Sequence, residues 1–236
     1  MALRPVFEAN QEKPYVRNRS VEFEFHPGFS IQQKQRSIES LHHAYLLHSP
    51  ESNVLEVSSK STSQLGVQLS SFNLMITHSN GRRCSVESAF QASKVFEDGG
   101  PYADLLRASS KQAKKDGRLR TSGKLLGFQF FDRKFPLEPK SYFYDWLYAS
   151  ALFRNKRLLE EVLHYDAFTD IEFNLDKSIN CQARSVAKVV GLCSQDLLDQ
   201  ALSDPESFCR IGYLDHSAED ATSDEQGAVE EQGFLF

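Results

Sequence analysis

The sequence predicts a mainly α-helical domain with a minor β element, at the margin of the α+β class. From residue 86 onward, apolar residues recur at helical spacing behind Ser, Asn or Asp residues suited to N-capping. The β signals are few: an alternating stretch at residues 21–25 and a hairpin signal at Asn80-Gly81. With 236 residues, 40% of them hydrophobic, the chain is long enough to bury a substantial core.

The first predicted elements are an arm, a strand, a helix and a hairpin. Residues 1–20 have mixed charge and read as an arm, and residues 21–25 alternate as a half-buried strand does. Residues 30–47 are expected to form a helix, with Ser30 and Gln33 at the positions of a capping box. A serine-rich loop with one brief strand at 54–57 follows, and then the hairpin around Asn80-Gly81.

The remainder of the chain is expected to be helical. Ser85, Ser109, Asn155 and Ser194 mark helix starts, and Asp204-Pro205 begins a last turn. The expected helices cover residues 86–97, 102–107, 111–118, 140–153, 156–164, 178–192 and 195–202. This organisation divides the chain into an N-terminal arm, strand and helix packed on the core (1–65), a main domain (66–213) and a disordered acidic tail (214–236).

Composition favours a cytoplasmic protein without a metal. The last 22 residues carry seven acids and no Lys or Arg, so the remaining chain has 27 basic against 25 acidic residues. No apolar run approaches the roughly 18 residues of a membrane span, and no secretory signal is evident at the N-terminus. The four cysteines and seven histidines show no metal-ligand spacing, so no metal or cofactor is expected.

The segment 85–96 carries the strongest chemical signal. On a helix, Glu87, Gln91 and Lys94 would share one face with Phe90 beside them. Such a stripe is usually a solvated surface. However, Glu87 and Lys94 are seven residues apart, about 10 Å along a helix, which is too far for a direct i,i+4 ion pair. A pocket for a ribose carrying phosphates is the alternative.

These residues resemble a known family. Leu69-Ser70-Ser71-Phe72, the Asn80-Gly81 turn and Glu87-Ser88-Ala89-Phe90-Gln91-Ala92-Ser93-Lys94 are similar to the signature of the NADAR/YbiA-like family. The similarity extends through residues 113–118 and 144–180, and covers roughly residues 66–193. Ser71 and Ser88 replace the family's Asn and His, and its Trp-Gly pair is missing. With the long N-terminal extension, the chain resembles the divergent NADAR branch encoded beside DarT-type DNA ADP-ribosyltransferase toxins.

The resemblance implies an antitoxin enzyme whose catalytic domain is residues 66–213. The implied activity is an ADP-ribosyl glycohydrolase that removes ADP-ribose from guanine bases in DNA. Its partners would be ADP-ribosylated DNA, ADP-ribose and a cognate DarT-type toxin. Two alternatives stay open: an N-glycosidase for small nucleotides or riboflavin-pathway metabolites, and a non-catalytic antitoxin that binds ADP-ribose.

Two residues are expected to be catalytic if the resemblance holds. Glu87 would stabilise an oxocarbenium-like transition state or activate water. Lys94 would either hold the ribose or diphosphate through its ammonium group, or attack the anomeric carbon as a nucleophile. The alternative interpretation is that both are ordinary surface residues without a catalytic role.

Six further residues are candidates for substrate binding. Gln91 belongs to the polar stripe, and Phe72 and Trp146 could stack on a base, although core packing is the commoner role of such rings. Asp170 and Asn180 could orient ribose hydroxyls or simply cap helices and turns. Arg118 could bind a phosphate or complement a helix dipole.

Two charged segments suggest partners. The basic residues between positions 111 and 124 could contact DNA phosphates, although charge runs are usually solvated faces. They are Lys111, Lys114, Lys115, Arg118, Arg120 and Lys124. The acidic tail, which ends in Gly-Phe-Leu-Phe, could dock on a partner or mimic DNA, or it could serve solubility alone.

Overall fold

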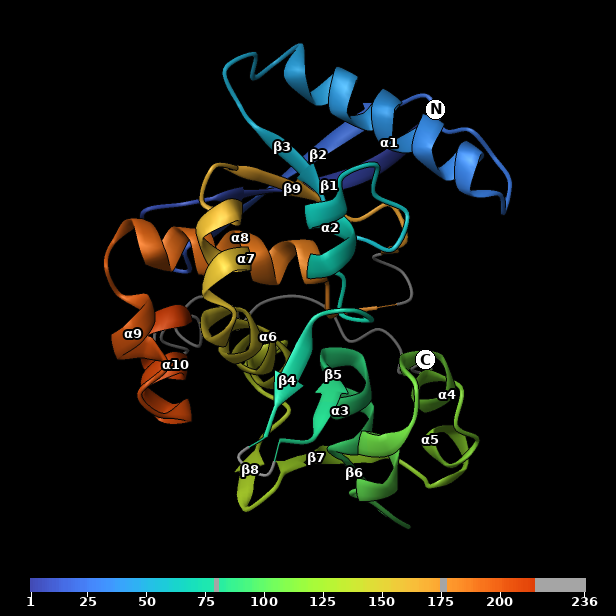
Figure 1. Cartoon of the computed structure of the whole chain (residues 1–236), viewed down its shortest axis with the longest axis vertical. Coiled ribbons are helices and arrows are strands. Elements are labelled where there is room, and N and C mark those ends of the chain that lie inside the picture. Colours follow the sequence, from blue (N-terminus) through green and yellow to red (C-terminus); the bar gives the residue numbers. More distant parts are fainter. Residues whose placement is uncertain (79–80, 175–177, 215–236) are drawn as a thin grey trace, which may run out of the picture.

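A computed structural model describes residues 1–78, 81–174 and 178–214 (Figure 1). The fold is mixed α+β, with 42% helix, 20% strand and three sheets, so the expectation of a mainly α domain is wrong. The missed strands escape pattern analysis for two reasons. Several have three residues, too few to show a period of two, and in the first strand residues 5–7 are buried in succession, which removes the polar alternation.

The largest sheet has four strands in the order β2-β1-β9-β3. It consists of β1 (Ala2–Ala9), β2 (Val16–Phe23), β3 (Val54–Glu56) and β9 (Ala167–Thr169). β1 is antiparallel to both β2 and β9, whereas β3 is parallel to β9. The segment expected as an N-terminal arm therefore supplies β1, an inner strand of this sheet, and the division of the chain at residue 65 stays a prediction.

Helices cover both faces of this sheet (Figure 1). Val6 and Ala167 pack with α1 (Ile31–Leu46), whereas their neighbours Phe7 and Phe168 belong to the main core, on the side of α8 (Gln182–Ser194). Neighbouring strand residues point to opposite faces, so one sheet separates two cores. α1 begins as predicted, because the Ser30 side chain accepts a hydrogen bond from the backbone N–H of Gln33.

The predicted hairpin is present between β4 (Met75–Thr77) and β5 (Arg83–Ser85). Asn80 lies outside the described residues, whereas Gly81 has a φ of +78°, which glycine adopts without strain. The short α2 (Gln64–Leu69) precedes this hairpin. A Cβ at Gly66 would lie 2.0 Å from the backbone oxygen of Glu56, so glycine permits the close approach of α2 to β3.

The helix expected over residues 86–97 is shorter than predicted. α3 (Val86–Ala92) ends at Ser93, and the chain continues as β6 (Lys94–Phe96), which pairs with β7 (Leu125–Phe130). β8 (Arg133–Phe135) completes an antiparallel sheet. Between β6 and β7 lie η1 (Ala103–Arg107), α4 (Ser110–Lys114) and α5 (Arg118–Thr121), so the helix expected over 111–118 is two short ones.

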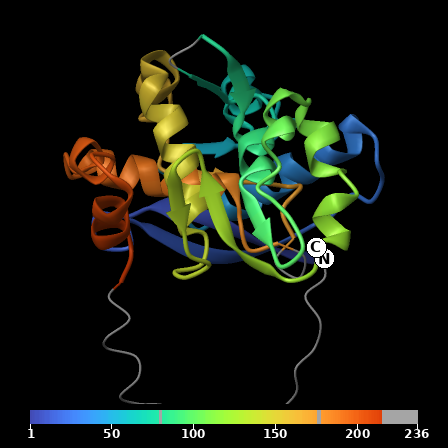
Figure 2. The same ribbon diagram turned by 90° about the horizontal axis from the view of Figure 1, so that it is seen from below.

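The remaining helices form the centre and one end of the molecule. α6 (Tyr142–Arg154) packs on α8 and leads into α7 (Lys156–Val162). α9 (Leu198–Ala201) and α10 (Pro205–Gly212) extend to the side opposite α4 and α5 (Figure 2). Asp204 caps α10 with Pro205 at its first turn, as predicted. The acidic tail from residue 215 lies outside the described residues. Across the described ranges, no helix has the length and hydrophobicity needed to cross a membrane.

Candidate functional site

The site is built on α3, which is buried along its whole length. Ser85 caps the helix by accepting a hydrogen bond from Ser88 N, and every residue from Val86 to Ala92 is buried. The interpretation of a solvated polar stripe therefore does not hold. Because a buried polar group without a partner costs free energy, the carboxylate and amide on this helix need specific contacts.

The carboxylate of Glu87 has partners on both oxygens. Ser71 Oγ donates a hydrogen bond of 3.3 Å to Oε2, and Gln91 Nε2 donates one of 3.0 Å to Oε1. The ammonium of Lys114 lies 3.9 Å from the same Oε1. The side chain of Glu87 is 7% exposed. These contacts fix the position of a carboxylate that solvent scarcely reaches.

Lys94 follows the helix and starts β6, where it pairs with Phe128. Its Nζ lies 5.1 Å from the centre of the Phe90 ring, in a cation–π position. Burial lowers the pKa of Lys94 to about 8, although the carboxylate of Glu87 acts in the opposite direction. At pH 7 roughly a tenth of the Lys94 side chains would then carry a neutral, nucleophilic amine.

Lys114 and Phe72 lie at the solvent side of Glu87. The Lys114 ammonium lies 5.3 Å from the centre of the half-buried Phe72 ring. Ser110 on α4 ties the two elements together by donating a hydrogen bond of 2.9 Å to the Phe72 carbonyl. A cation and an aromatic face beside Glu87 suit a ligand that has both phosphates and a base.

Behind Glu87, a hydrogen-bonded path leads to a second acidic group. The backbone N–H of Ser71 donates a 2.7 Å hydrogen bond to Gln182 Oε1 on α8. The Gln182 amide also hydrogen-bonds the side chain of Asp170. Asp170 is therefore connected to Glu87 through Gln182 and Ser71, although it comes from the end of β9.

Asp170 forms a close acidic pair with Glu56. Glu56 is buried and accepts hydrogen bonds from Thr169 Oγ1 (2.6 Å) and Ile171 N (2.9 Å). Burial and the mutual repulsion of the pair raise the pKa of Asp170 well above its usual range, and burial raises the pKa of Glu56. Because two adjacent carboxylates do not readily ionise together, the pair holds a proton more tightly than isolated acids do.

The structure thus brings together Phe72, Glu87, Gln91 and Lys94, and links Asp170 to them. Arg118 lies elsewhere: its guanidinium forms ion pairs with Asp104 (2.6 Å) and Asp116 (2.9 Å). It also stacks on Tyr102, with Cζ 4.5 Å from the ring centre. These carboxylates occupy the donors that a phosphate would need.

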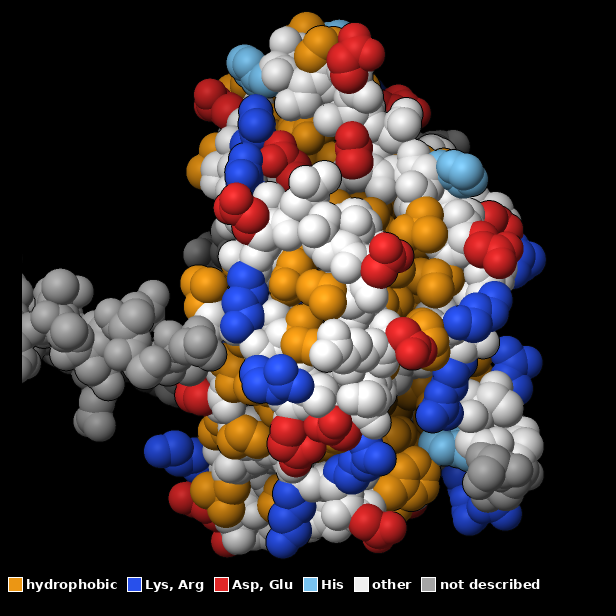
Figure 3. All heavy atoms as spheres, turned by 90° about the vertical axis from the view of Figure 1, so that its left-hand side faces the viewer, with side chains coloured by type: hydrophobic (Ala, Val, Ile, Leu, Met, Phe, Trp, Pro, Cys, Tyr) orange, Lys and Arg blue, Asp and Glu red, His pale blue; other side chains and the backbone are white. Residues whose placement is uncertain are grey.

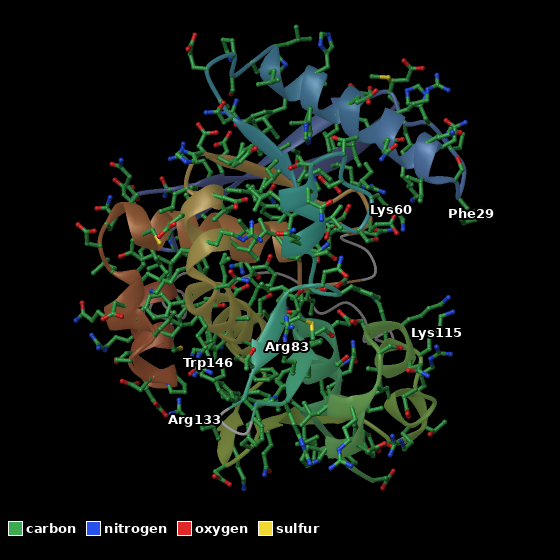
Figure 4. All side chains as sticks on the ribbon, in the orientation of Figure 1. Phe29, Lys60, Arg83, Lys115, Arg133 and Trp146 are labelled. Atoms are coloured by element: carbon green, nitrogen blue, oxygen red, sulfur yellow. The ribbon has the colours of Figure 1, made fainter. Side chains whose placement is uncertain are left out.

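Trp146 is also apart from Glu87, whereas Asn180 is two residues before Gln182, the partner of Ser71. Trp146 is buried on α6, and its ring centre lies 4.9 Å from that of Phe135. Figure 4 shows it on the side of the molecule opposite Lys115, which directly follows α4. Asn180 comes shortly before α8, where its carbonyl accepts a hydrogen bond from Ser178. Trp146 therefore has the surroundings of a core residue.

Three contributors to the site carried no individual prediction. Ser71 appeared as a departure from the family pattern, and Lys114 as one member of a basic run. Gln182 had no signal at all, because its partner Ser71 is 111 positions away in the sequence. Lys114 could have been singled out, because it occupies the Lys position of the segment that resembles the family's Ala-Lys-x-x-Gly-Arg pattern.

Chemically, the site places a fixed carboxylate and a partly buried lysine beside a buried amide oxygen. Gln91 Oε1 is buried and has no hydrogen-bond partner among the described residues, so an unsatisfied acceptor lies beside Glu87. Among the described residues, no group of three or more His, Cys, Asp or Glu side chains is placed to bind a metal ion. The side chains of Glu87 and Lys94 are suited to acid, base and nucleophilic chemistry.

Glu87 and Gln91 on α3 and Lys94 at the start of β6 lie close together, and this arrangement defines a NADAR-type domain. The chain matches the family described as DarT1-associated NADAR antitoxin over residues 2–222, and it belongs to that family. Membership supports an antitoxin role with a DarT-type toxin as cognate partner, and suggests glycohydrolase-type activity in general terms. No curated protein matches the chain.

Proposed function

We propose that this antitoxin is an ADP-ribosyl glycohydrolase that removes ADP-ribose from guanine bases in DNA. The observation that carries the proposal is the pairing of a doubly hydrogen-bonded Glu87 carboxylate with a Lys94 of lowered pKa. Such a pair suits cleavage of a glycosidic C–N bond, in which positive charge develops at the anomeric carbon. The family's association with a DarT-type toxin supports the choice of DNA as substrate.

In this proposal Glu87 stabilises the positive charge that develops on the ribose. Its oxygens are fixed by Ser71 and Gln91, so little reorganisation is needed as the bond breaks. The unpartnered Gln91 Oε1 would accept a hydrogen bond from a ribose hydroxyl. Lys114 and Phe72, at the solvent side, would contact the diphosphate and an adjacent base.

Lys94 has two possible roles in the same reaction. As an ammonium, it would bind the ribose or diphosphate electrostatically. In the second role, the ribose C1′–O4′ bond opens as a proton moves from the guanine amino nitrogen to O4′, which leaves an imine between C1′ and that nitrogen. The neutral Lys94 amine would add to C1′, pass its two protons to the guanine nitrogen and displace it as the free amino group, leaving an imine between C1′ and Lys94. Water would then hydrolyse that imine to give ADP-ribose and restore the amine. The lowered pKa of Lys94 favours the second role.

The test uses the full chain and single-stranded DNA carrying ADP-ribose on guanine, without added metal. The parent is expected to release ADP-ribose, whereas Glu87→Gln and Lys94→Met are expected to lose at least about 100-fold in rate. Glu97→Gln, a change of the same type at an exposed position, is the matched control. Thermal unfolding of each variant shows that the fold is retained.

Three outcomes would change the assignment. A folded parent that releases nothing from DNA but cleaves an N-glycosidic metabolite would support the small-molecule N-glycosidase. A parent that binds ADP-ribose without cleaving either substrate would support the non-catalytic antitoxin. Activity retained in both variants would leave the enzyme in place and refute the Glu87 and Lys94 site.

A further inference from the structure

A cavity of about 450 Å³, which Glu87 does not line, lies between the β4–β5 hairpin and the junction of α6 with α7. Its lining includes four basic side chains and, within the described residues, no acidic one. These are Arg83, Arg154, Lys156 and Arg157. Figure 3 shows Lys and Arg side chains following one another along one edge of this face of the molecule. Concentrated positive charge in a concave surface attracts anions.

The four cations are exposed, and three of them lack acidic partners among the described residues; one of these, Lys156, instead lies 3.8 Å from the centre of the Phe153 ring. Arg157 is held by Glu161 (2.5 Å) and by Gln68 Oε1 (2.6 Å). Within the part of the chain that the structure describes, Arg83 and Arg154 form no ion pair. Their charges are therefore available to a ligand.

An exposed aromatic residue adjoins these cations. Phe131, at the turn between β7 and β8, is 56% exposed and has a φ of +52°, a costly conformation for a bulky side chain. Its ring centre lies 5.0 Å from that of His78, which directly follows the cavity residue Thr77. A basic groove beside an aromatic face is the arrangement that binds single-stranded nucleic acid.

The cavity is also close to the catalytic helix along the chain. Arg83 and Glu87 are four residues apart, so their Cα atoms are at most about 14 Å from each other. A strand of a few nucleotides would span that separation. The labelled Arg83 lies on β5, which leads directly into α3 (Figure 4).

We infer that this cavity and Phe131 form a second contact surface that binds the single-stranded DNA flanking the modified guanine. Arg83, Arg154 and Lys156 bind backbone phosphates, and Phe131 stacks on a base. The inference rests on the proposed function for its choice of DNA. It adds a binding surface that is separate from the residues that cleave the glycosidic bond.

The first test measures the binding of a fluorescent, unmodified single-stranded oligonucleotide of about twelve nucleotides. Arg83→Glu/Arg154→Glu is expected to raise Kd at least about tenfold and to reduce the salt slope by about 1.4, or about 0.7 per lost phosphate contact. Phe131→Ala is expected to raise Kd about fivefold or more without changing that slope. Arg17→Glu/Arg36→Glu, the same charge change on β2 and α1, is the control and should bind within about threefold of the parent.

A second measurement separates this inference from the proposed function. The double variant is expected to raise KM for ADP-ribosylated oligonucleotide and to leave KM for ADP-ribosylated guanosine unchanged. If the parent cleaves modified DNA and the double variant binds the oligonucleotide as tightly as the control variant does, the second contact surface is refuted and the proposed glycohydrolase activity is not. A parent that binds the oligonucleotide through Arg83 and Arg154 but releases no ADP-ribose would support the surface and refute the glycohydrolase.

Discussion

Gln91 donates a hydrogen bond of 3.0 Å to Glu87 Oε1, one helical turn earlier on α3, and leaves its own Oε1 buried without a partner among the described residues. Because a carboxylate can only accept, the orientation of the Gln91 amide is fixed by this contact. One side chain therefore both holds the carboxylate and leaves an unsatisfied acceptor beside it.

Gln91→Met is expected to lower the rate of ADP-ribose release about 10- to 100-fold, because a hydrogen bond to a charged group contributes about 1.5–3 kcal/mol. Methionine has a similar size, so the buried helix should still pack. Single-turnover kinetics would measure the change. Gln32→Met, on the exposed side of α1, serves as the control, and a parent-like rate for Gln91→Met would contradict the assigned role.

The pH dependence of the reaction should report on Lys94. With a pKa of about 8, its neutral fraction rises with pH, so a nucleophilic Lys94 predicts a single-turnover rate that increases from pH 6 and levels off above pH 8. Reduction of the reaction mixture with cyanoborohydride should attach the sugar covalently to Lys94, detectable by mass spectrometry. A rate that falls above pH 8, with no adduct, would identify the ammonium as the active form instead.

Substitutions of Lys114 and Arg118 should affect KM differently, although both residues lie in one basic segment. Lys114→Gln is expected to raise KM several-fold, because its ammonium lies 3.9 Å from Glu87 and faces Phe72. Arg118→Gln is expected to stay within about threefold of the parent, because Asp104 and Asp116 already occupy its guanidinium. Steady-state kinetics measure KM for the two variants. A larger rise in KM for Arg118→Gln than for Lys114→Gln would place the phosphate at Arg118.

The acidic pair of Glu56 and Asp170 should make stability depend on pH. Both carboxyl groups have a raised pKa in the folded protein. Their favourable contribution to the free energy of unfolding is therefore complete below the pKa of the unfolded chain, near 4, and is lost as the pH rises through the pKa values of the folded protein. Glu56→Gln removes one titrating group and is expected to flatten the stability curve between pH 5 and 8. Urea unfolding across that range tests this, with the exposed Glu51→Gln as control; an unchanged curve would exclude the pair as its origin.

A separate buried ion cluster anchors the C-terminal helix. Asp145 on α6 accepts hydrogen bonds from Arg184, Ser185 and Tyr213, and Lys188 lies 3.6 Å away. Asp145→Asn would leave these cations without a counter-charge, and is expected to reduce the free energy of unfolding by about 3 kcal/mol. The exposed Asp132→Asn should cost little by comparison. Denaturant titration provides both values, and equal stabilities would show that the cluster contributes no net stability.

Local patterns in the sequence predicted the features that depend on neighbouring residues. The caps at Ser30, Ser85 and Asp204 and the hairpin before α3 follow from interactions within a few residues. The Glu87–Gln91 contact is of the same kind, because i and i+4 positions meet on a helix. These features needed no knowledge of the rest of the chain.

The tertiary structure determined the contacts between segments that are far apart in the sequence. β1 is an inner strand because β9, some 160 residues later, pairs with it, and Gln182 reaches Ser71 across 111 positions. Lys94 leaves the helix because β7 offers it a strand partner, which helical spacing alone could not reveal. The local sequence pattern thus identified Glu87, Gln91 and Lys94 as candidates, whereas long-range pairing and burial determine which groups contact them.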